Sequence, residues 1–298
     1  MRRLVPTART RGRGWLPSVD GPFLRRLAYL GSRYGPEPLV RYSPTLVGAL
    51  FALALPNRRR IVIRALRRVR GERHWMVEQL DAVRTFSHYA HCLAESLGAG
   101  RRAMKSRVND ERELQDILAA KSGLVLVTAH TGLWDVTARL LARSSEVDVK
   151  VVMQREADAR ARAFHDQLRT DARVEIVHVD HPVDSMDLLR HLRRGGVVAI
   201  QMDRVPHGQR GIELRLGGAP FRVPAGPFLL AAAARVPVLA VFARRVDYFD
   251  YEITFGRARR LPSRPADTVL YEAASAFVEE LAAFVQEHPN DWFHFDEG

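Results

Sequence analysis

A histidine and an aspartate lie five residues apart, directly after an apolar segment of the chain. The segment reads GLVLVTAHTGLWD and contains His130 and Asp135. A carboxylate that orients an imidazole makes a general base able to deprotonate a hydroxyl. Five residues would put the two side chains on different sides of one continuous helix, so they can meet only across a corner between two elements. A histidine bonded near a strand end, beside an aspartate that caps a helix, is the alternative.

The elements around this pair supply such a corner. Residues 123–129 form a continuous apolar run, which is typical of a buried parallel strand. Residues 134–143 follow a helical pattern. We therefore expect His130 at the carboxyl end of a strand and Asp135 near the start of a helix. Active sites of open α/β sheets gather at the carboxyl ends of their strands.

A second polar loop also follows an apolar run. Residues 196–202 form that run, Asp203 and Arg204 come next, and Arg222 lies further along the same glycine- and proline-rich segment. Arginine in such a loop suits bidentate binding of phosphate or carboxylate, and backbone N–H groups there can hold a developing oxyanion. Arg155, after another predicted strand, is a candidate of the same kind. Solvated arginines on an ordinary surface loop are the alternative.

Strands and helices alternate from residue 123 onward, which predicts βαβ units and an α/β fold with a mainly parallel central sheet flanked by helices. The predicted strands are 123–129, 149–153, 174–179, 196–202, 237–243 and 249–255, of which the last two could be antiparallel. The predicted helices are 75–98, 110–120, 134–143, 157–169, 184–194, 225–234 and 267–287.

Positive charge is concentrated at the N-terminal end. The formal charge is +12, and residues 1–75 hold 17 arginines against three acidic residues. The stretch 58–70, RRRIVIRALRRVR, predicts a basic amphipathic helix of the kind that lies on anionic lipid, or else a solvated helix face beside a core. The apolar stretch 46–55 has ten residues, whereas a bilayer span needs about 20.

These patterns divide the chain into three parts. We expect a mobile basic N-terminus over residues 1–22, an N-terminal helical, membrane-associating region over 23–120 and an α/β catalytic domain over 121–298. The first 20 residues lack the apolar core of a secretory signal peptide.

Several enzyme classes lack their signatures here. The sequence has no Walker A motif, no dinucleotide-binding fingerprint and no G-x-S-x-G elbow, so we do not expect a serine hydrolase. Its single cysteine, Cys92, excludes an intrachain disulfide and a cysteine zinc site. The histidines show no convincing metal-ligand spacing, and we expect no metal.

The segment HTGLWD at 130–135 carries the histidine–x4–acid signature of the lysophospholipid acyltransferase superfamily, which the chain resembles over residues 25–295. Within that superfamily it is similar to the bacterial lipid A late acyltransferases and the related phosphatidylinositol mannoside acyltransferases. The shared features are a basic N-terminal arm, the loop at Asp203-Arg204, the PAGP turn at 224–227 and a PxxW ending at 289–292. Many lipid A members have Asn-Trp-Glu where this chain has Leu-Trp-Asp, which leaves the acceptor open.

The resemblance implies a glycerol-3-phosphate acyltransferase-like fold and an O-acyltransferase. The resemblance implies that His130 takes a proton from an acceptor hydroxyl. The hydroxyl oxygen then attacks the thioester of an acyl carrier protein or of coenzyme A. Asp135 holds the imidazole in its working tautomer. The implied substrate-binding residues, for phosphate or the oxyanion, are Arg155, Asp203, Arg204 and Arg222. The acyl thioester is a co-substrate, and no cofactor is implied.

The implied partners are a glycolipid or lysophospholipid acceptor and an anionic membrane surface. The arm would dock the protein, as a peripheral or monotopic one, on the cytoplasmic face of the cell inner membrane.

Two other functions stay open. A nucleic-acid-binding protein would carry aromatic residues among the basic ones and a recognisable module. The aromatic residues of the arm fit an interfacial role equally well, so we expect no nucleic acid partner. An inactive relative that serves as a scaffold is the other possibility, against which the intact pair of His130 and Asp135 argues.

Overall fold

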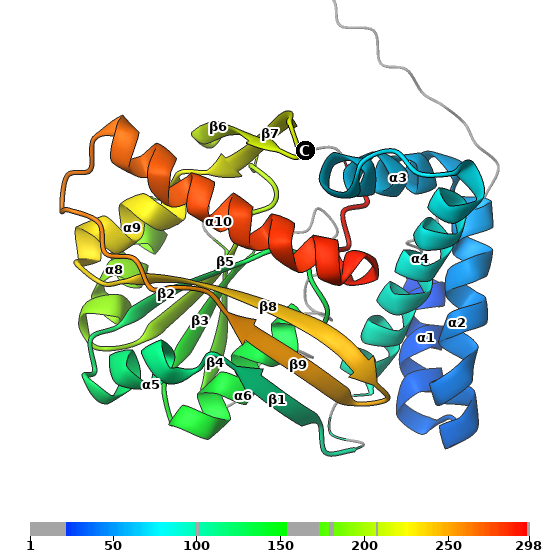
Figure 1. The fold of residues 1–298 in the computed structure, drawn as a ribbon. Coiled ribbons are helices and arrows are strands. Elements are labelled where there is room, and N and C mark those ends of the chain that lie inside the picture. Colours follow the sequence, from blue (N-terminus) through cyan, green and yellow to red (C-terminus); the bar gives the residue numbers. More distant parts are fainter. Residues whose placement is uncertain are drawn as a thin grey trace, which may run out of the picture.

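The centre of the molecule is a seven-stranded sheet in the order β1-β9-β8-β2-β5-β3-β4 (Figure 1). It comes from a computed structural model, which describes residues 22–98, 100, 102–153, 173–178, 182–206 and 208–296. The strands are β1 (Lys105–Asn109), β2 (Leu124–Thr128), β3 (Val149–Met153), β4 (Val174–His178), β5 (Val197–Gln201), β8 (Val238–Asp247) and β9 (Asp250–Phe255). Neighbouring strands from β8 to β4 are parallel, β9 is antiparallel to β8, and β1 is parallel to β9. The predicted α/β class with a mainly parallel sheet is confirmed.

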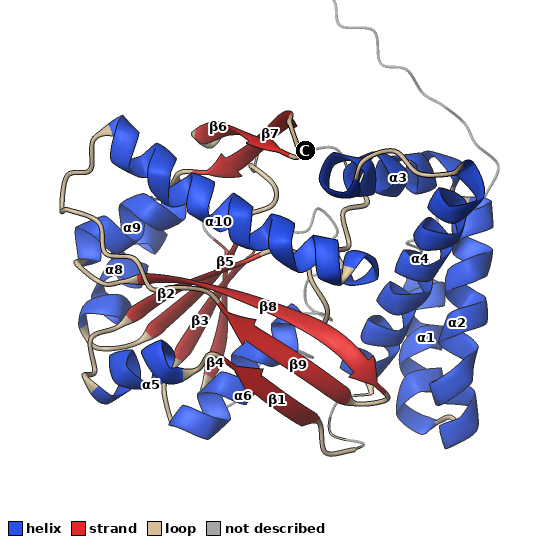
Figure 2. Cartoon of the chain, in the orientation of Figure 1, coloured by secondary structure: helices blue, strands red, loops and turns tan. Residues whose placement is uncertain are grey.

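Helices cover both faces of this sheet, and two apolar cores result (Figure 2). One face packs on α5 (Arg112–Ala119) and α6 (Trp134–Ser145), and the other on α8 (Pro182–Arg193), α9 (Gly226–Ala234) and α10 (Asp267–Glu287). The position of strand β2 between the two cores explains the apolar run in its sequence. Leu124 and Leu126 belong to the first core, and Val125 and Val127 to the second. Successive side chains of a strand point to opposite faces, so a strand buried on both sides is a continuous apolar run.

All six predicted strands are present, and the last two are antiparallel as proposed. Three further strands were not predicted. Strand β1 is exposed at all five positions and lies at the sheet edge, so it lacks the apolar pattern of a buried strand. It falls within the 23–120 region expected to be helical. Strands β6 (Gly211–Leu216) and β7 (Ala219–Pro224) form a separate hairpin. The predicted helix 157–169 and residues 1–21 of the basic N-terminus lie outside the described residues.

Four N-terminal helices stand together beside the sheet (Figure 1). They are α1 (Pro22–Tyr34), α2 (Glu37–Ala54), α3 (Pro56–Arg70) and α4 (Trp75–Leu97). Helices α2 and α4 approach closely at Gly48, where a Cβ atom would lie 2.4 Å from the Cα of Ser87.

A buried carboxylate of α4 ties these helices to the sheet. Glu95 accepts hydrogen bonds from Arg245 Nε (2.8 Å) and from the backbone N–H of Phe249 (3.1 Å). Burial raises the pKa of Glu95, although Arg245 opposes the shift. Breaking a buried ion pair is strongly destabilising, because it leaves an uncompensated charge. The pair of Glu95 and Arg245 therefore holds α4 against β8.

None of the described helices is, by itself, long and apolar enough to cross a bilayer. Helices α2 and α3 together meet the length and composition requirement, but the chain bends by 100° between them.

Candidate active site

The register of two neighbouring parallel strands brings His130 and Asp203 together. In the β2–β5 pair Thr128 lies opposite Gln201, and His130 and Asp203 each follow two residues later. The backbone N–H of Met202 donates to Thr128 O (2.8 Å), which carries the pairing past the strand ends. His130 Nδ1 then lies 2.7 Å from Asp203 Oδ1. The pair therefore sits at the carboxyl edge of the sheet, where active sites of open α/β folds gather.

Asp203 is an ionised carboxylate in a fully buried position. Its side chain is 0% exposed, and its Oδ2 atom accepts from Trp292 Nε1 (3.0 Å) and from the backbone N–H of His130 (3.2 Å). Burial by itself raises the pKa of such a group, but the positive charge of the His130 imidazolium, when the ring is protonated, and its hydrogen bond outweigh burial and hold the pKa of Asp203 well below its usual range. His294 Nδ1 is 4.0 Å away, beyond hydrogen-bond range.

An ionised carboxylate only accepts hydrogen bonds, so His130 must donate from Nδ1. That fixes the tautomer of the neutral ring and leaves the lone pair on Nε2. The side chain of His130 is 27% exposed, so solvent or a ligand can reach the imidazole ring. When Nε2 takes a proton, the carboxylate stabilises the resulting imidazolium. The arrangement can thus act as a general base toward a hydroxyl.

The C-terminal segment holds the loop that carries His130. The backbone N–H of Phe293 donates to His130 O (2.7 Å), and that of Gly132 donates to Asp291 O (3.0 Å). Gly132 has φ +47°, and a Cβ atom there would lie 2.3 Å from Ala243 O, so only glycine fits. Thr131 is fully buried and accepts from the backbone N–H of Ala243 (3.3 Å). These contacts fix the backbone that carries His130.

The predicted site residues are distributed as follows. Asp135 lies in the first turn of α6, and its side chain is outside the part that the structure describes, so its role stays a prediction. Arg155 also lies outside the described residues. Asp203, which the sequence placed among the substrate-binding residues, contacts the imidazole of His130.

Two arginines of the second loop lie in different settings. Arg204 donates from Nη2 to Phe293 O (3.1 Å), while its Nε is buried without a partner among the described residues. Arg222 lies on β7, is 57% exposed, and has its Nε 4.0 Å from Glu213 Oε1. Arg204 is therefore joined to the segment that holds the His130 loop, whereas Arg222 belongs to the hairpin.

The contact between His130 and Asp203 was not predicted from the sequence, although the sequence contains a signal for it. Both residues directly follow predicted strands, and parallel strands end at the same edge of a sheet. The contribution of Trp292 carried no such signal, because it comes from a segment 89 residues further along.

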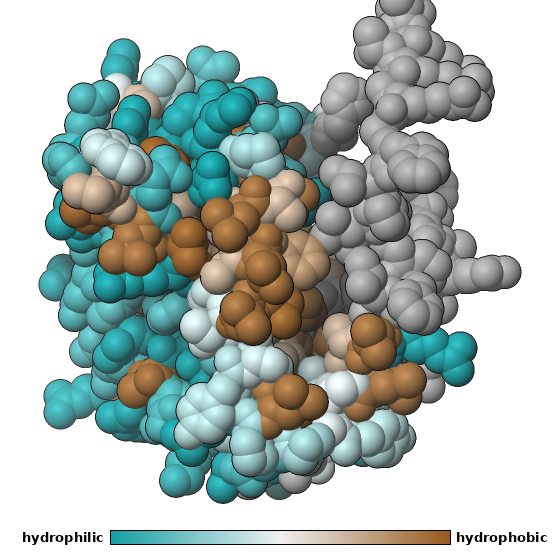
Figure 3. All heavy atoms as spheres, turned by 90° about the vertical axis from the view of Figure 1, so that its right-hand side faces the viewer, coloured by the Kyte–Doolittle hydropathy of each residue, from teal (hydrophilic) through white to brown (hydrophobic). Residues whose placement is uncertain are grey.

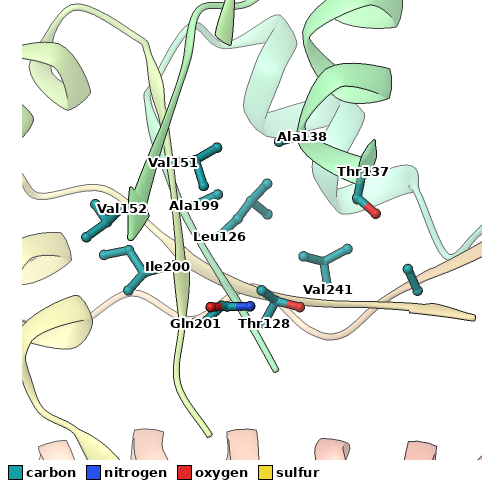
Figure 4. Close-up of a pocket in the computed structure, with 11 residues that line it drawn as sticks. Leu126, Thr128, Thr137, Ala138, Val151, Val152, Ala199, Ile200, Gln201 and Val241 are labelled. Carbon is teal, nitrogen blue, oxygen red and sulfur yellow. The ribbon is translucent and has the colours of Figure 1, made fainter. Parts of the chain in front are cut away.

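A mostly apolar cavity lies between α6 and the sheet (Figure 4). Its lining includes Leu126, Ala138, Val151, Ala199 and Val241. Its polar lining residues are Thr128 and Gln201, at the carboxyl ends of β2 and β5, and Thr137 of α6. The cavity thus reaches the last residues before the loops of His130 and Asp203. Within the described residues, no group of three or more histidine, cysteine or acidic side chains is placed to hold a metal ion.

The pair of His130 and Asp203 lies at the edge of a mainly parallel sheet, next to a small apolar cavity, in an arrangement that can act as a general base. The family model of bacterial lipid A biosynthesis acyltransferases matches residues 23–297, and the chain belongs to this family. This confirms the resemblance drawn from the sequence motifs and supports acyl transfer involving a lipid as the reaction. No curated protein sequence matches the chain at a significant level.

Proposed function

We propose that this protein is a membrane-associated O-acyltransferase that moves a fatty acyl chain from a thioester to a hydroxyl of a glycolipid or lysophospholipid. The donor would be acyl carrier protein or coenzyme A. The observation that carries the proposal is the hydrogen bond from His130 Nδ1 to buried Asp203, because it leaves Nε2 as the basic atom in a partly exposed ring.

In the proposed reaction His130 Nε2 takes the proton of the acceptor hydroxyl as its oxygen attacks the thioester carbonyl. A C–O bond forms, the C–S bond of the tetrahedral intermediate breaks, and the proton passes from the imidazolium to the leaving thiolate. Asp203 acts as a positioning residue, since it holds the ring and its charge offsets the imidazolium. Asp135, the acidic residue of the HTGLWD motif, is proposed as a second catalytic carboxylate beside Asp203.

The cavity under α6 is the proposed position of the acyl chain, for which it must widen beyond its present volume of about 20 Å³. Its lining is mostly aliphatic, and burying each methylene of an acyl chain in such surroundings stabilises the complex by about 0.8 kcal/mol. Arg155, Arg204 and Arg222 are proposed to bind anionic groups of the donor or acceptor.

The N-terminal helices are proposed to dock on anionic lipid at the cytoplasmic face of the inner membrane. We define their apolar face by exposed large side chains on three helices: Leu27, Leu30 and Tyr34 of α1, Leu39, Tyr42, Leu46, Leu50 and Leu53 of α2, and Trp75, Met76 and Leu80 of α4. The α2 members recur at helical spacing, so they share one side of the helix. Figure 3 shows hydrophobic side chains gathered on the side of the molecule that these helices form.

The neighbouring helix α3 carries the basic residues that complement this face. Its sequence, PNRRRIVIRALRRVR, contains seven arginines and no acidic residue. Anionic lipid attracts each nearby arginine by about 1 kcal/mol. An apolar face next to a basic helix suits a lipid surface better than nucleic acid, because the apolar side chains gain nothing from phosphate contacts.

Lipid mass spectrometry tests the proposed function. We would compare total lipids from matched cells that express the wild type, the His130→Ala variant or neither. The expected result is a lipid that gains one acyl chain with the wild type only, and its mass shift would identify the acceptor and the chain. If the lipidomes match, a thiol-release assay with acyl thioesters separates a host without acceptor from a pair that does no chemistry.

A further inference from the structure

Gln201 has a side-chain nitrogen that is buried and without a hydrogen-bond partner among the described residues. The residue ends β5, lines the cavity under α6 and lies two positions before Asp203. In Figure 4 its carboxamide lies beside Thr128, away from the aliphatic part of the cavity. A buried donor without a partner costs free energy, so its presence at the end of an apolar cavity calls for a ligand that accepts a hydrogen bond.

The other polar residues of the cavity already have partners. The hydroxyl of Thr128 donates to Ala129 O (3.2 Å), and that of Thr137 donates to Leu133 O (3.4 Å). Among the described side chains that line this cavity, the Gln201 amide is therefore the donor left for a ligand.

The position of Gln201 identifies the ligand atom. Gln201 and Asp203 are two residues apart, which is roughly 6.5 Å along an extended chain, and Asp203 in turn holds His130. A fatty acyl chain that enters this cavity, which must widen to take it, has the thioester carbonyl as its first polar group, placed at the end that Gln201 and Thr128 line. We propose that the Gln201 Nε2 amide donates a hydrogen bond to that carbonyl oxygen and stabilises the oxyanion that forms when the acceptor attacks. This inference rests on the proposed function.

The step is balanced by groups already described. The acceptor oxygen forms a bond to the carbonyl carbon, and its proton goes to His130 Nε2. The carbonyl π electrons move to the oxygen, which Gln201 holds while the charge is present. The electrons return as the C–S bond breaks, and the thiolate takes the proton from His130. A neutral amide donor keeps its proton throughout.

A role in binding the oxyanion predicts opposite effects of one substitution on rate and stability. Replacing Gln201 by an apolar residue of similar size removes the donor needed in the transition state, and loss of one such donor lowers kcat by about 10²- to 10³-fold. The same change removes a buried amide nitrogen without a partner from a half-buried side chain, so the melting temperature stays the same or rises. A residue that only supports the fold would lower both.

The experiment compares the wild type with Gln201→Leu, Gln201→Met, His130→Ala and the matched control Gln115→Leu, which makes the same change on the exposed side of α5. The substrates are palmitoyl thioesters of coenzyme A and of acyl carrier protein, with vesicles of total bacterial lipid as the acceptor. Thiol release gives kcat and KM, and thermal unfolding gives Tm.

We expect both Gln201 variants to lose at least 30-fold in kcat, with a KM near that of the wild type and no fall in Tm, while Gln115→Leu keeps the wild-type rate. A kcat within about threefold of the wild type in either Gln201 variant would overturn the inference. A fall in both kcat and Tm would overturn it too, because the side chain would then be structural. If the wild type itself shows no His130-dependent thiol release, the proposed function fails and this inference fails with it.

Discussion

Replacing Asp203 by asparagine perturbs the site at its buried anion while keeping the shape of the side chain. The carboxylate accepts from three groups: the imidazole Nδ1 of His130 at 2.7 Å, the backbone N–H of the same residue and the indole of Trp292. An amide at this position can turn its NH2 group toward the imidazole. The ring then presents a lone pair at Nδ1 and carries its proton on Nε2, the atom that has to accept the hydroxyl proton.

The expected loss is large because two effects add. The wrong tautomer removes the base, and the missing charge no longer stabilises the imidazolium. A comparable change in a serine protease triad lowers kcat by about 10⁴-fold, which corresponds to about 5.4 kcal/mol of transition-state stabilisation. We expect Asp203→Asn to reduce kcat for thiol release by at least 10³-fold and to leave KM for the acyl thioester within about threefold.

The assay needs a control for folding, because Asp203 is buried. Circular dichroism and the unfolding midpoint in urea should show that Asp203→Asn folds, since asparagine can still accept one of the hydrogen bonds. If the variant folds and keeps more than a tenth of the wild-type kcat, the carboxylate does not position the base, and the reasoning from the β2–β5 register is refuted.

Gly132→Ala places a Cβ atom 2.3 Å from Ala243 O, so we expect about 1–3 kcal/mol less stability in urea unfolding and a lower kcat. An unchanged unfolding free energy would show that the loop adapts. Leu46→Asp with Leu50→Asp should reduce cosedimentation with anionic vesicles at least tenfold, whereas the control Met186→Asp, at an exposed site on α8, should not. Equal losses would count against the apolar face. Burial, with the charges of Arg245 and His88, lowers the pKa of His91 to about 4. The unfolded chain therefore takes up a proton below about pH 6.5 that the folded chain refuses. The unfolding free energy should fall as pH drops from about 6.5 to about 4, and His91→Gln should flatten that fall; parallel curves would contradict it.

The strands of the sheet could be predicted because burial on both faces leaves a simple pattern. In β2 each residue from Leu124 to Thr128 is buried, so the apolar run marks the strand directly. Strand β1 has the sequence KSRVN and is joined to β9 by its backbone and by polar side chains, Arg107 and Asn109, so its exposed side chains carry no apolar pattern. The turn of the β6–β7 hairpin has Gly217 and Gly218 at positive φ, a recognised hairpin signal that the flanking arginines obscured.

A site residue could be predicted where its signal lies in the adjacent sequence. It could be predicted only partly where its role depends on pairing between strands that are distant in the sequence. His130 could be singled out from the strand that precedes it. Its contact with Asp203 depends on which strands are neighbours and in what register, and an alternation of strands and helices along the chain leaves that order open. Trp292 reaches Asp203 only because the chain returns to the sheet edge after α10.

The imidazole of His130 is proposed to be the base for acyl transfer to a lipid hydroxyl. A transfer assay with purified wild type and His130→Gln, in anionic vesicles of bacterial lipid with palmitoyl thioesters, tests it by measuring the acylated lipid directly with mass spectrometry. The account predicts an acylated lipid with the wild type and at least 10³-fold slower formation with the folded variant. Formation at a similar rate by His130→Gln would contradict the account.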